Sequence, residues 1–316
     1  MEQMTLQQGH ALCTQIADNI EKVIIGKRGV IENTLVACLA NGHVLLEDVP
    51  GVGKTMLAKA LAVTIGGNFA RLQFTPDLMP SDVTGVSIFD QQAGCFRFRK
   101  GPVFANVLLA DEINRANPRT QSALLEAMEE HQVTIDGETH ALPIPFLVIA
   151  TENPVEYEGV YVLPESQLDR FMLKISIGYP SADDEKTMVK SQLRSSPIED
   201  LTPVCKPSDV LRLQTLSSAC HVDDSVYDYI LEIVRRTREV DDLHLGASPR
   251  GTLALVRTAQ ALATLHGRDF VSPDDIKHLA VSTLAHRMML APHARLGETR
   301  TADILDDILD EVAVPV

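Results

Sequence analysis

The sequence predicts an α/β domain with a central parallel sheet, followed by a smaller all-helical domain. Three short apolar runs, at residues 44–46, 107–109 and 146–149, have the length and composition of strands that are buried on both faces. Stretches with helical periodicity lie between them, and this alternation favours a parallel sheet flanked by helices. The rest of the sequence carries only helical patterns. We therefore predict two domains, at residues 1–180 and 181–316.

Two helices are expected to cover the sheet. Residues 55–64 follow a glycine-rich turn and end at a pair of glycines, which terminate helices readily. In residues 118–130, apolar side chains recur three and four positions apart and therefore share one face. That face can pack on the sheet.

Two segments interrupt the alternation of strands and helices. Residues 133–142 contain two β-prone pieces around an Asp-Gly pair, which is a hairpin signal. Residues 76–102 contain several glycines and prolines together with a Phe-Arg-Phe-Arg cluster. We interpret the second segment as an insertion that forms a further small hairpin or a loop.

The second domain begins after a glycine and a proline near residue 180, which mark a hinge, and Ser181 can cap its first helix. Ser248-Pro249 and Ser272-Pro273 each combine a cap residue with proline at the first helical position. The expected helices span residues 183–195, 207–218, 223–239, 249–265 and 273–286.

The distribution of apolar residues indicates in which cellular compartment we expect the protein. Hydrophobic residues make up 45% of the chain, but no apolar run approaches the roughly 20 residues needed to cross a bilayer. The N-terminus lacks a basic start followed by an apolar stretch. We therefore expect a soluble, cytoplasmic protein without membrane insertion.

Charge and cysteine content argue against two classes of partner. The five cysteines are widely spaced, with no Cys-x-x-Cys pair and no histidine at metal-ligand spacing, so we expect reduced thiols and no metal cage. A formal net charge of −15 disfavours a protein that mainly grips nucleic acid, because phosphate contacts need a concentrated basic surface. The charge leaves room for a small basic pore.

A phosphate-binding loop is expected between the first strand and the first helix. Glycines at Gly51 and Gly53 let backbone N–H groups point at phosphate oxygens, and the following helix adds its positive dipole end. Lys54 would neutralise the β- and γ-phosphates, and the Thr55 hydroxyl would bind Mg²⁺. Asp48 occupies the position at which the general P-loop pattern has its first glycine.

Polar residues at the ends of the next two strands can complete such a site. Asp111 and Glu112 supply one carboxylate for the Mg²⁺ shell and another to activate water. Acidic residues in a loop are often only solvated, but these follow a buried strand downstream of the P-loop. Asn153 follows the third strand and can reach the same edge, although Asn-Pro by itself indicates only a turn.

Two arginines could stabilise the charge on a transferring γ-phosphoryl group. Arg170 and Arg250 each lie at the start of a helical or turn segment. A lone arginine is usually a surface residue or an ion-pair partner, and spacing alone does not select these two.

Four strings, in this order, carry the resemblance of the chain to a known family. With them the chain resembles the MoxR family of AAA+ ATPases from about Val23 to Arg250, and more weakly beyond. The strings are Leu46–Thr55, Asp111–Ala116, Ala150–Pro154 and Gln167–Phe171.

The resemblance implies a role for each candidate residue. Asp111 and Glu112 are similar to the Walker B pair and Asn153 to sensor 1. Arg170 looks like the arginine finger offered to a neighbouring subunit, and Arg250 looks like sensor 2 on a helical lid. The implied ligands are ATP and Mg²⁺, with Mg²⁺ at Thr55 and Asp111. The implied nucleotide contacts are Ile25, Gly26, Pro50, Gly51, Val52, Gly53, Lys54, Thr55 and Met56, of which the first two belong to a segment similar to the one that lines the adenine pocket.

The resemblance also reinterprets the irregular segments and suggests partners. Residues 76–102 would correspond to the helix-two insert, and residues 133–142 to the insert before the sensor 1 strand. Proteins of this family typically form hexameric rings and remodel protein clients, often with a partner that carries a von Willebrand factor A domain. The resemblance alone implies these partners for this chain.

Two alternative functions stay open at this point. The first is a nucleotide-dependent switch or scaffold that binds ATP and hardly hydrolyses it, which the presence of Glu112 disfavours because a pure switch needs no base. The second is a DNA helicase or loader on the same fold. The net charge and the absence of an added DNA-binding module disfavour that reading.

Overall fold

A parallel sheet forms the centre of the protein, as predicted, and it has five strands, two more than the three apolar runs indicated. The computed structural model describes residues 4–153, 161–193, 196–297 and 299–315. The strand order is β2-β5-β8-β1-β9, and every neighbouring pair is parallel. The strands are β1 (Val44–Glu47), β2 (Phe69–Gln73), β5 (Val107–Asp111), β8 (Leu147–Glu152) and β9 (Leu173–Ile175).

The central strands β1, β5 and β8 are buried on both faces, and successive side chains of each strand point to opposite sides of the sheet. In β1, Val44 and Leu46 belong to one hydrophobic cluster, whereas Leu45 belongs to the other. Helices α1 (Leu6–Glu21), α2 (Arg28–Leu39) and α3 (Lys54–Thr64) supply the first cluster, and α5 (Pro118–Glu130) supplies the second. These strands therefore read as continuous apolar runs in the sequence.

Helices α1 and α2 were not predicted. Helix α1 nevertheless carries its own signals, since Thr5 and Gln8 form a capping box at its start. Cys13, Ile16 and Ile20 recur at helical spacing and are buried. The signal for this helix therefore lies in the sequence that precedes the first apolar strand.

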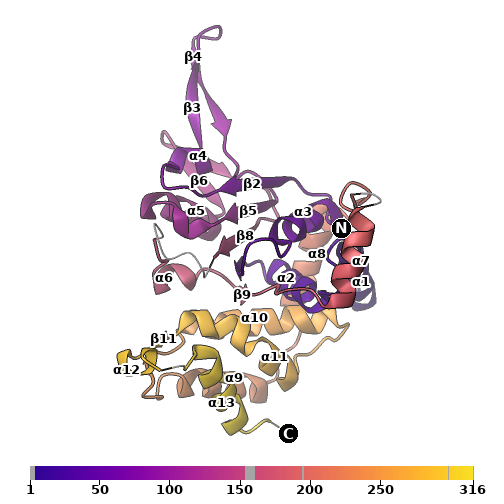
Figure 1. The fold of residues 1–316 in the computed structure, drawn as a ribbon, viewed down its shortest axis with the longest axis vertical. Helices are drawn as coiled ribbons and strands as arrows, with labels where there is room; N and C mark the ends of the chain where they lie inside the picture. Colours follow the sequence, from indigo (N-terminus) through magenta and orange to yellow (C-terminus); the bar gives the residue numbers. More distant parts are fainter. Residues whose placement is uncertain (1–3, 154–160, 194–195, 298, 316) are drawn as a thin grey trace.

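Both irregular segments contain hairpins. Residues 76–102 form the short helix α4 (Pro80–Thr84) and the antiparallel pair β3 (Gly85–Asp90) and β4 (Cys95–Lys100). This hairpin projects away from the rest of the molecule (Figure 1). The second hairpin joins β6 (Gln132–Ile135) to β7 (Glu138–Ala141). Its turn places Asp136 and Gly137 at positive φ, which is the conformation that an Asp-Gly pair favours.

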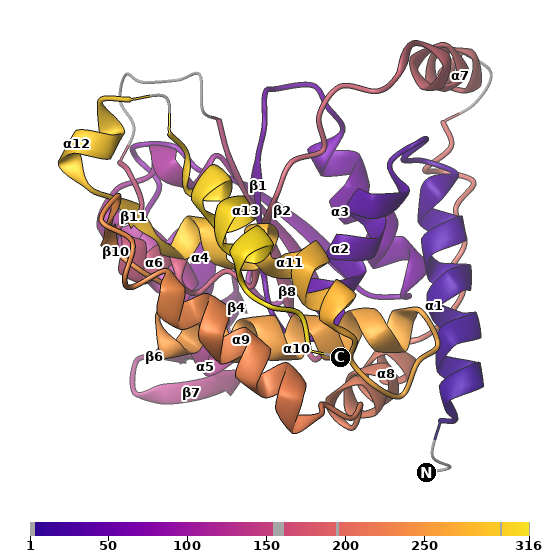
Figure 2. The ribbon, with the colours of Figure 1, turned by 90° about the horizontal axis from the view of Figure 1, so that it is seen from below.

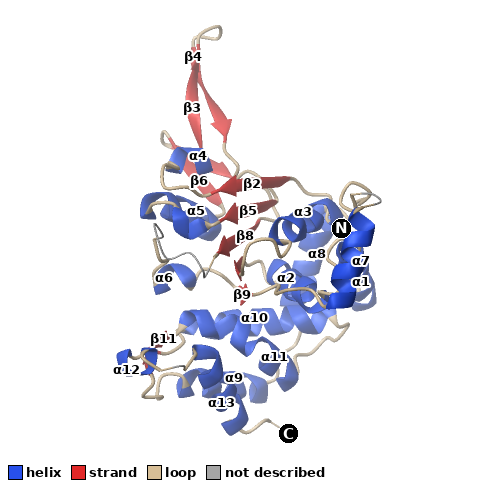
Figure 3. Ribbon diagram, in the orientation of Figure 1, coloured by secondary structure: helices blue, strands red, loops and turns tan. Residues whose placement is uncertain are grey.

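The chain beyond β9 is mainly helical (Figure 3). It contains one feature that the prediction of helices alone missed, the small antiparallel pair β10 (Leu243–Leu245) and β11 (Met289–Leu290). Strands this short show too little alternation to be recognised. The C-terminal helix α13 was also not predicted. The helices are α7 (Ala182–Gln192), α8 (Pro207–Ser218), α9 (Asp224–Arg236), α10 (Pro249–Leu265), α11 (Pro273–Leu284), α12 (Pro292–Arg295) and α13 (Thr301–Glu311).

Three of the predicted helices end earlier in the structure than the sequence suggested: α7, α9 and α11 end at Gln192, Arg236 and Leu284. Residues 194–195, at the predicted end of the first, lie outside the described residues, as does Pro154 of the third family string. In the described part of the chain, none of the helices has both the length and the apolar character needed to cross a bilayer.

The helical part packs directly on the helices of the α/β part. Helix α10 contacts both α2 and α8, and α8 also contacts α1. One hydrophobic cluster continues from Cys13 in α1 to Leu309 in α13. Figure 2 shows this arrangement from the helical side, with α9, α10, α11 and α13 in front of the sheet. The helices and the sheet therefore share a continuous core.

Candidate functional site

The turn between β1 and α3 has the backbone that a P-loop requires. Gly51 and Gly53 have φ values of 89° and 100°, in the left-handed region that favours glycine. A Cβ atom at either position would meet no neighbouring atom within 4 Å, so conformation and not crowding selects glycine here. Helix α3 begins at Lys54 directly after this turn, which aims its free N–H groups at the loop.

Asp48 fastens the loop to the end of β9. Its Oδ2 accepts hydrogen bonds from the backbone N–H groups of Ile177 and Gly178, both at 2.7 Å, and from the Ser176 hydroxyl at 2.9 Å. Its Oδ1 accepts from the N–H of Val49. Burial alone would raise the pKa of Asp48, but these hydrogen bonds outweigh it and lower the pKa. The departure from the general P-loop pattern is therefore a structural clasp.

Asp111 and Glu112 lie at the end of β5 and are joined through a residue that sequence reasoning missed. The Thr151 hydroxyl is fully buried, donates to Asp111 Oδ1 at 2.7 Å and accepts from the Glu112 N–H at 2.8 Å. Thr151 belongs to the string Ala150–Pro154, so its place at the end of a strand beside β5 was the available signal. It ties the Asp111 carboxylate to the backbone of Glu112.

Strand β2 also reaches both carboxylates. The Arg71 guanidinium donates to Asp111 Oδ2 through Nη2 at 2.7 Å and Nε at 3.2 Å. The Gln73 amide donates to Glu112 Oε2 at 2.7 Å, and Arg115 forms an ion pair with the same oxygen at 2.9 Å. In this conformation a guanidinium therefore lies at the carboxylate that the sequence assigns to Mg²⁺.

Lys54 lies within the field of these carboxylates. Its ammonium donates to the Asp48 carbonyl oxygen at 2.7 Å. Burial lowers the pKa of Lys54, while the negative charges of Asp111, Asp48 and Glu112 oppose this shift. The structure thus brings the P-loop lysine and both predicted carboxylates to one edge of the sheet.

The donor set at this edge fits Mg²⁺. Among the described residues, no three His, Cys, Asp or Glu side chains converge as a protein metal cage. Mg²⁺ does not need one, because it keeps several waters and is usually held by one or two protein oxygens together with substrate phosphates. Thr55 in the first turn of α3 and Asp111 at the end of β5 can supply those oxygens.

Asn153 follows β8 directly and is buried. Strand β8 lies between β5 and β1, so Asn153 sits between the strand that ends in Asp111 and the strand that leads into the P-loop. Because the strands are parallel, their carboxyl ends meet at the same edge of the sheet. Asn153 therefore lies at the edge where the sequence placed it.

An apolar cavity of about 250 Å³ adjoins the P-loop. Ile25, Val52 and Met56 line it from the α/β part, and Met188 and Pro197 line it from the segment that follows β9. Its chemistry suits a flat heteroaromatic base. Gly26, between the lining residues Ile25 and Lys27, has a φ of 71°, and a Cβ atom there would collide with the Asp184 carboxylate of α7. Glycine is therefore required beside this cavity.

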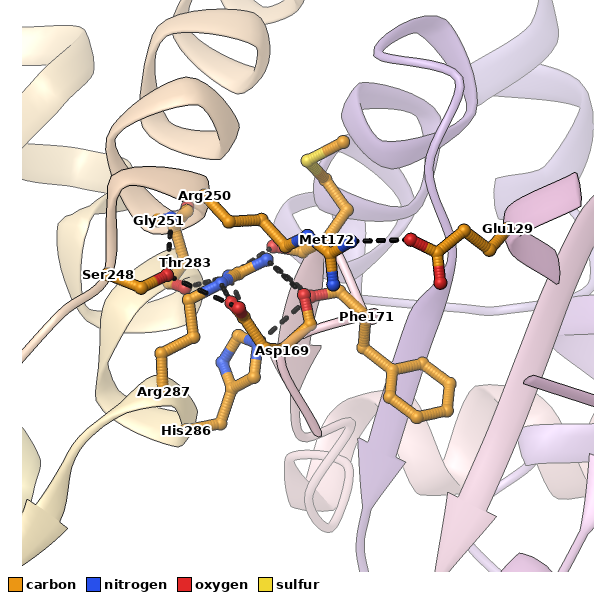
Figure 4. A network of polar contacts seen from close by, with 10 residues as sticks. All are labelled: Glu129, Asp169, Phe171, Met172, Ser248, Arg250, Gly251, Thr283, His286 and Arg287. Carbon is orange, nitrogen blue, oxygen red and sulfur yellow. Dashed lines mark hydrogen bonds and ion pairs between the residues drawn. The ribbon is translucent and has the colours of Figure 1, made fainter. Parts of the chain in front are cut away.

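Arg170 and Arg250 lie together, at the other edge of the sheet. Both form ion pairs with Glu129 of α5, Arg170 at 3.2 Å and Arg250 at 2.5 Å, the second of which is drawn in Figure 4. They line a cavity of about 270 Å³ with His43, which precedes β1. The P-loop follows the opposite end of β1, and a strand rises about 3.3 Å per residue. Neither arginine therefore shares an edge with Lys54 of its own chain.

The chain is similar to known proteins over nearly its whole length. Residues 43–173 match the model of the ATPase family associated with various cellular activities, and residues 235–308 match an AAA lid domain. The protein YeaC of Bacillus subtilis is 53% identical over 97% of this chain and 96% of its own length. The chaperone MoxR1 of Mycobacterium tuberculosis is 42% identical over 94% of this chain and 80% of its own length. The chain belongs to the MoxR family of AAA+ ATPases.

A solved structure supports the same assignment for the fold. A protein from Cytophaga hutchinsonii is 38% identical and superposes with a TM-score of 0.92, over 98% of this chain and 97% of its own. The two proteins therefore share their fold over nearly the whole length of both chains. Arg250 and α10 lie within residues 235–308, which match the lid model.

Proposed function

We propose that the chain hydrolyses ATP with Mg²⁺ at a site completed by a second copy of itself in a ring, and that it remodels a protein partner. The observation that carries this proposal is the division of the site between two edges of one sheet. Lys54, Asp111 and Glu112 lie at the carboxyl edge, whereas Arg170 and Arg250 share Glu129 at the amino edge. A head-to-tail ring brings one edge against the other in successive subunits.

Each residue then has a chemical task. The P-loop N–H groups and Lys54 bind the phosphates, and the apolar cavity beside Ile25 accepts the base. Thr55 and Asp111 would hold Mg²⁺, which neutralises charge on the β- and γ-phosphates. Glu112 takes a proton from the attacking water, and Asn153 orients that water. Guanidinium groups from the neighbour stabilise the charge on the γ-phosphoryl oxygens.

Complementation between two inactive variants tests the shared site. Lys54→Ala loses the phosphate grip and Arg170→Ala loses the arginine offered to the neighbour, so each alone should release phosphate at a small fraction of the wild-type rate. In an equal mixture, about a quarter of interfaces join an intact P-loop to an intact arginine. Turnover should therefore reappear on mixing. A mixture as inactive as its components would refute the shared site.

One observation favours the switch or scaffold as a second candidate. The Glu112 carboxylate is engaged by Gln73 and Arg115 and is not left to water in this conformation. Glu112→Gln separates the two functions, because it removes the base and preserves the shape. Equal and negligible phosphate release by wild type and Glu112→Gln would favour the scaffold.

The protein client and the ring size rest on family likeness. A relative in this family bears the name chaperone, which supports a role in remodelling proteins. The hexameric ring and a partner with a von Willebrand factor A domain follow from the same likeness. Capture of a protein by Glu112→Gln in ATP tests the client, because a trapped ATP state should hold it longest. Absence of any enriched protein would remove that support.

A further inference from the structure

The turn that carries Arg170 is held by the lid on both sides. It joins α6 (Glu165–Leu168) to β9. The Asp169 carboxylate accepts a hydrogen bond from Arg287 Nε at 2.8 Å through Oδ1, and from the Ser248 hydroxyl at 3.2 Å through Oδ2 (Figure 4). Ser248 caps α10 and Arg287 ends the turn after α11, so two separate lid elements meet on one carboxylate.

Arg287 also binds the backbone of the turn. Its Nη2 donates to the carbonyl oxygens of Phe171 at 2.8 Å and Asp169 at 3.3 Å, and its Nη1 donates to Met172 at 3.2 Å. A further hydrogen bond to the Thr283 carbonyl anchors the guanidinium within the lid. The Arg287 side chain is only 2% exposed, so these contacts are screened little by solvent.

These lid contacts are made to Asp169, Phe171 and Met172, on either side of Arg170. Carbonyl groups before and after it accept from Arg287, and His286 Nε2 lies 3.0 Å from the Phe171 carbonyl oxygen. The Arg170 guanidinium instead points to Glu129 of α5, which also holds Arg250. The lid thus fixes the backbone of Arg170, while its side chain forms an ion pair that is only partly exposed, 30% at Arg170 and 39% at Glu129. Because the buried Arg170 Nε makes no hydrogen bond in this pair, the guanidinium gains by exchanging Glu129 for a phosphate.

We propose that Arg287 is a positioning residue through which the lid sets the direction in which Arg170 meets the nucleotide of the neighbouring subunit. The inference rests on the shared site proposed above. Arg287 reaches no phosphate itself, because it is enclosed by the turn and by α11. The rigid Arg287 guanidinium binds the Asp169 carboxylate and the carbonyl groups of Asp169, Phe171 and Met172. The turn therefore moves together with the lid. Lid rotation in one subunit therefore changes catalysis in the next.

Mixing experiments separate this role from general damage. Arg287→Met should bind a fluorescent ATP analogue as tightly as wild type, because its own P-loop is untouched, while its turnover falls by about 100-fold, the scale of a misplaced catalytic group. An equal mixture with Lys54→Ala should regain turnover to the level reached by Arg170→Ala with Lys54→Ala. In that mixture, the Lys54→Ala chain supplies a well-placed Arg170 to the intact P-loop of the Arg287→Met chain.

Two variants serve as controls. Arg268→Met removes another lid arginine, which pairs with buried Asp275 at 2.6 Å and does not touch the turn. It should lower stability and keep the wild-type turnover per folded chain. Arg287→Lys keeps a positive charge beside Asp169 but cannot span the three carbonyls, so it should show an intermediate loss. It replaces Arg287→Met in the mixtures if the methionine variant does not fold.

Three results would overturn the inference. The first is wild-type turnover by Arg287→Met or Arg287→Lys alone. The second is failure of either variant to recover with Lys54→Ala when Arg170→Ala does recover, which would leave the shared site standing and reduce Arg287 to a fold-maintaining role. The third is failure of Arg170→Ala to recover as well, which would refute the shared site and the inference together.

Discussion

Replacing Asp48 with glycine completes the general P-loop pattern, and we expect it to harm the protein. The carboxylate makes three hydrogen bonds to residues 176–178 and one to Val49. In Asp48→Gly, the partly buried N–H groups of Ile177 and Gly178 lose their acceptor, and an unsatisfied buried donor costs about 1–3 kcal/mol. Some of this cost is recovered by water entering the vacated space. The added backbone freedom of glycine contributes about 1 kcal/mol more.

These contributions together predict a loss of about 3 kcal/mol in the free energy of unfolding. Urea titration at pH 7 measures this loss, and a titration with a fluorescent ATP analogue measures nucleotide affinity, which should fall because the loop is no longer fastened to β9. Asp48→Asn is the matched control. It keeps one acceptor oxygen and should lose about half as much.

The clasp also predicts a dependence on acid. Hydrogen bonding lowers the pKa of Asp48 in the folded state below its usual 3.8, so the stability it contributes is present above 3.8 and is lost as the pH falls through the folded value. The difference between wild type and Asp48→Gly should therefore shrink in strong acid. The reasoning fails if the two proteins unfold within about 0.5 kcal/mol of each other at pH 7.

Three further substitutions test other contacts of the site. Arg71→Met should lower the Mg²⁺ concentration that half-saturates ATP binding by about fivefold, because it frees Asp111 from an exposed ion pair; an unchanged Mg²⁺ titration contradicts this. Thr151→Val should reduce phosphate release about tenfold in a folded protein, since it unties the Asp111 carboxylate from the Glu112 backbone, and wild-type turnover would exclude that role. Burial raises the pKa of Glu152 to about 6, so its penalty on stability appears as the pH rises through that value. The free energy of unfolding of Glu152→Gln, measured by urea titration, should therefore exceed that of wild type by up to about 2 kcal/mol at pH 8 and equal it at pH 4. The same difference at both pH values would contradict this explanation.

The parts of the fold that the sequence predicted are those with strong local patterns. Buried parallel strands appear as uninterrupted apolar runs. Ser248 and Ser272 predict the starts of their helices, because a cap and a following proline act over only a few residues. The short pair β10 and β11 depends on a partner more than 40 residues away. Such pairing leaves no periodicity to detect. Helix α1, by contrast, carries its signals locally, in a capping box and a buried apolar face.

The same distinction applies to the site. Lys54 and Asp111 could be predicted because each follows a strand at a fixed offset, and parallel strands bring their carboxyl ends together. Thr151 and Arg71 acquire their roles only from the strand order β2-β5-β8, which places one on each side of Asp111. The role of Asp48 depends on residues almost 130 positions away. A single sequence carries no record of such pairings.

Glu129 connects the two arginines to the core of their own subunit. It lies near the end of α5, one residue after Met128, which is buried against the sheet. Its single carboxylate forms ion pairs with both Arg170 and Arg250, so one positive charge of the three groups stays uncompensated. In the proposed shared site, a triphosphate in the next subunit would offer more negative charge, so both guanidinium groups would gain by leaving Glu129. Arg250 belongs to the lid and Arg170 to a turn that the lid grips through Arg287. Transfer of the two guanidinium groups from Glu129 to phosphate would therefore move the lid and the turn together. We expect nucleotide binding in one subunit and lid position in its neighbour to change together.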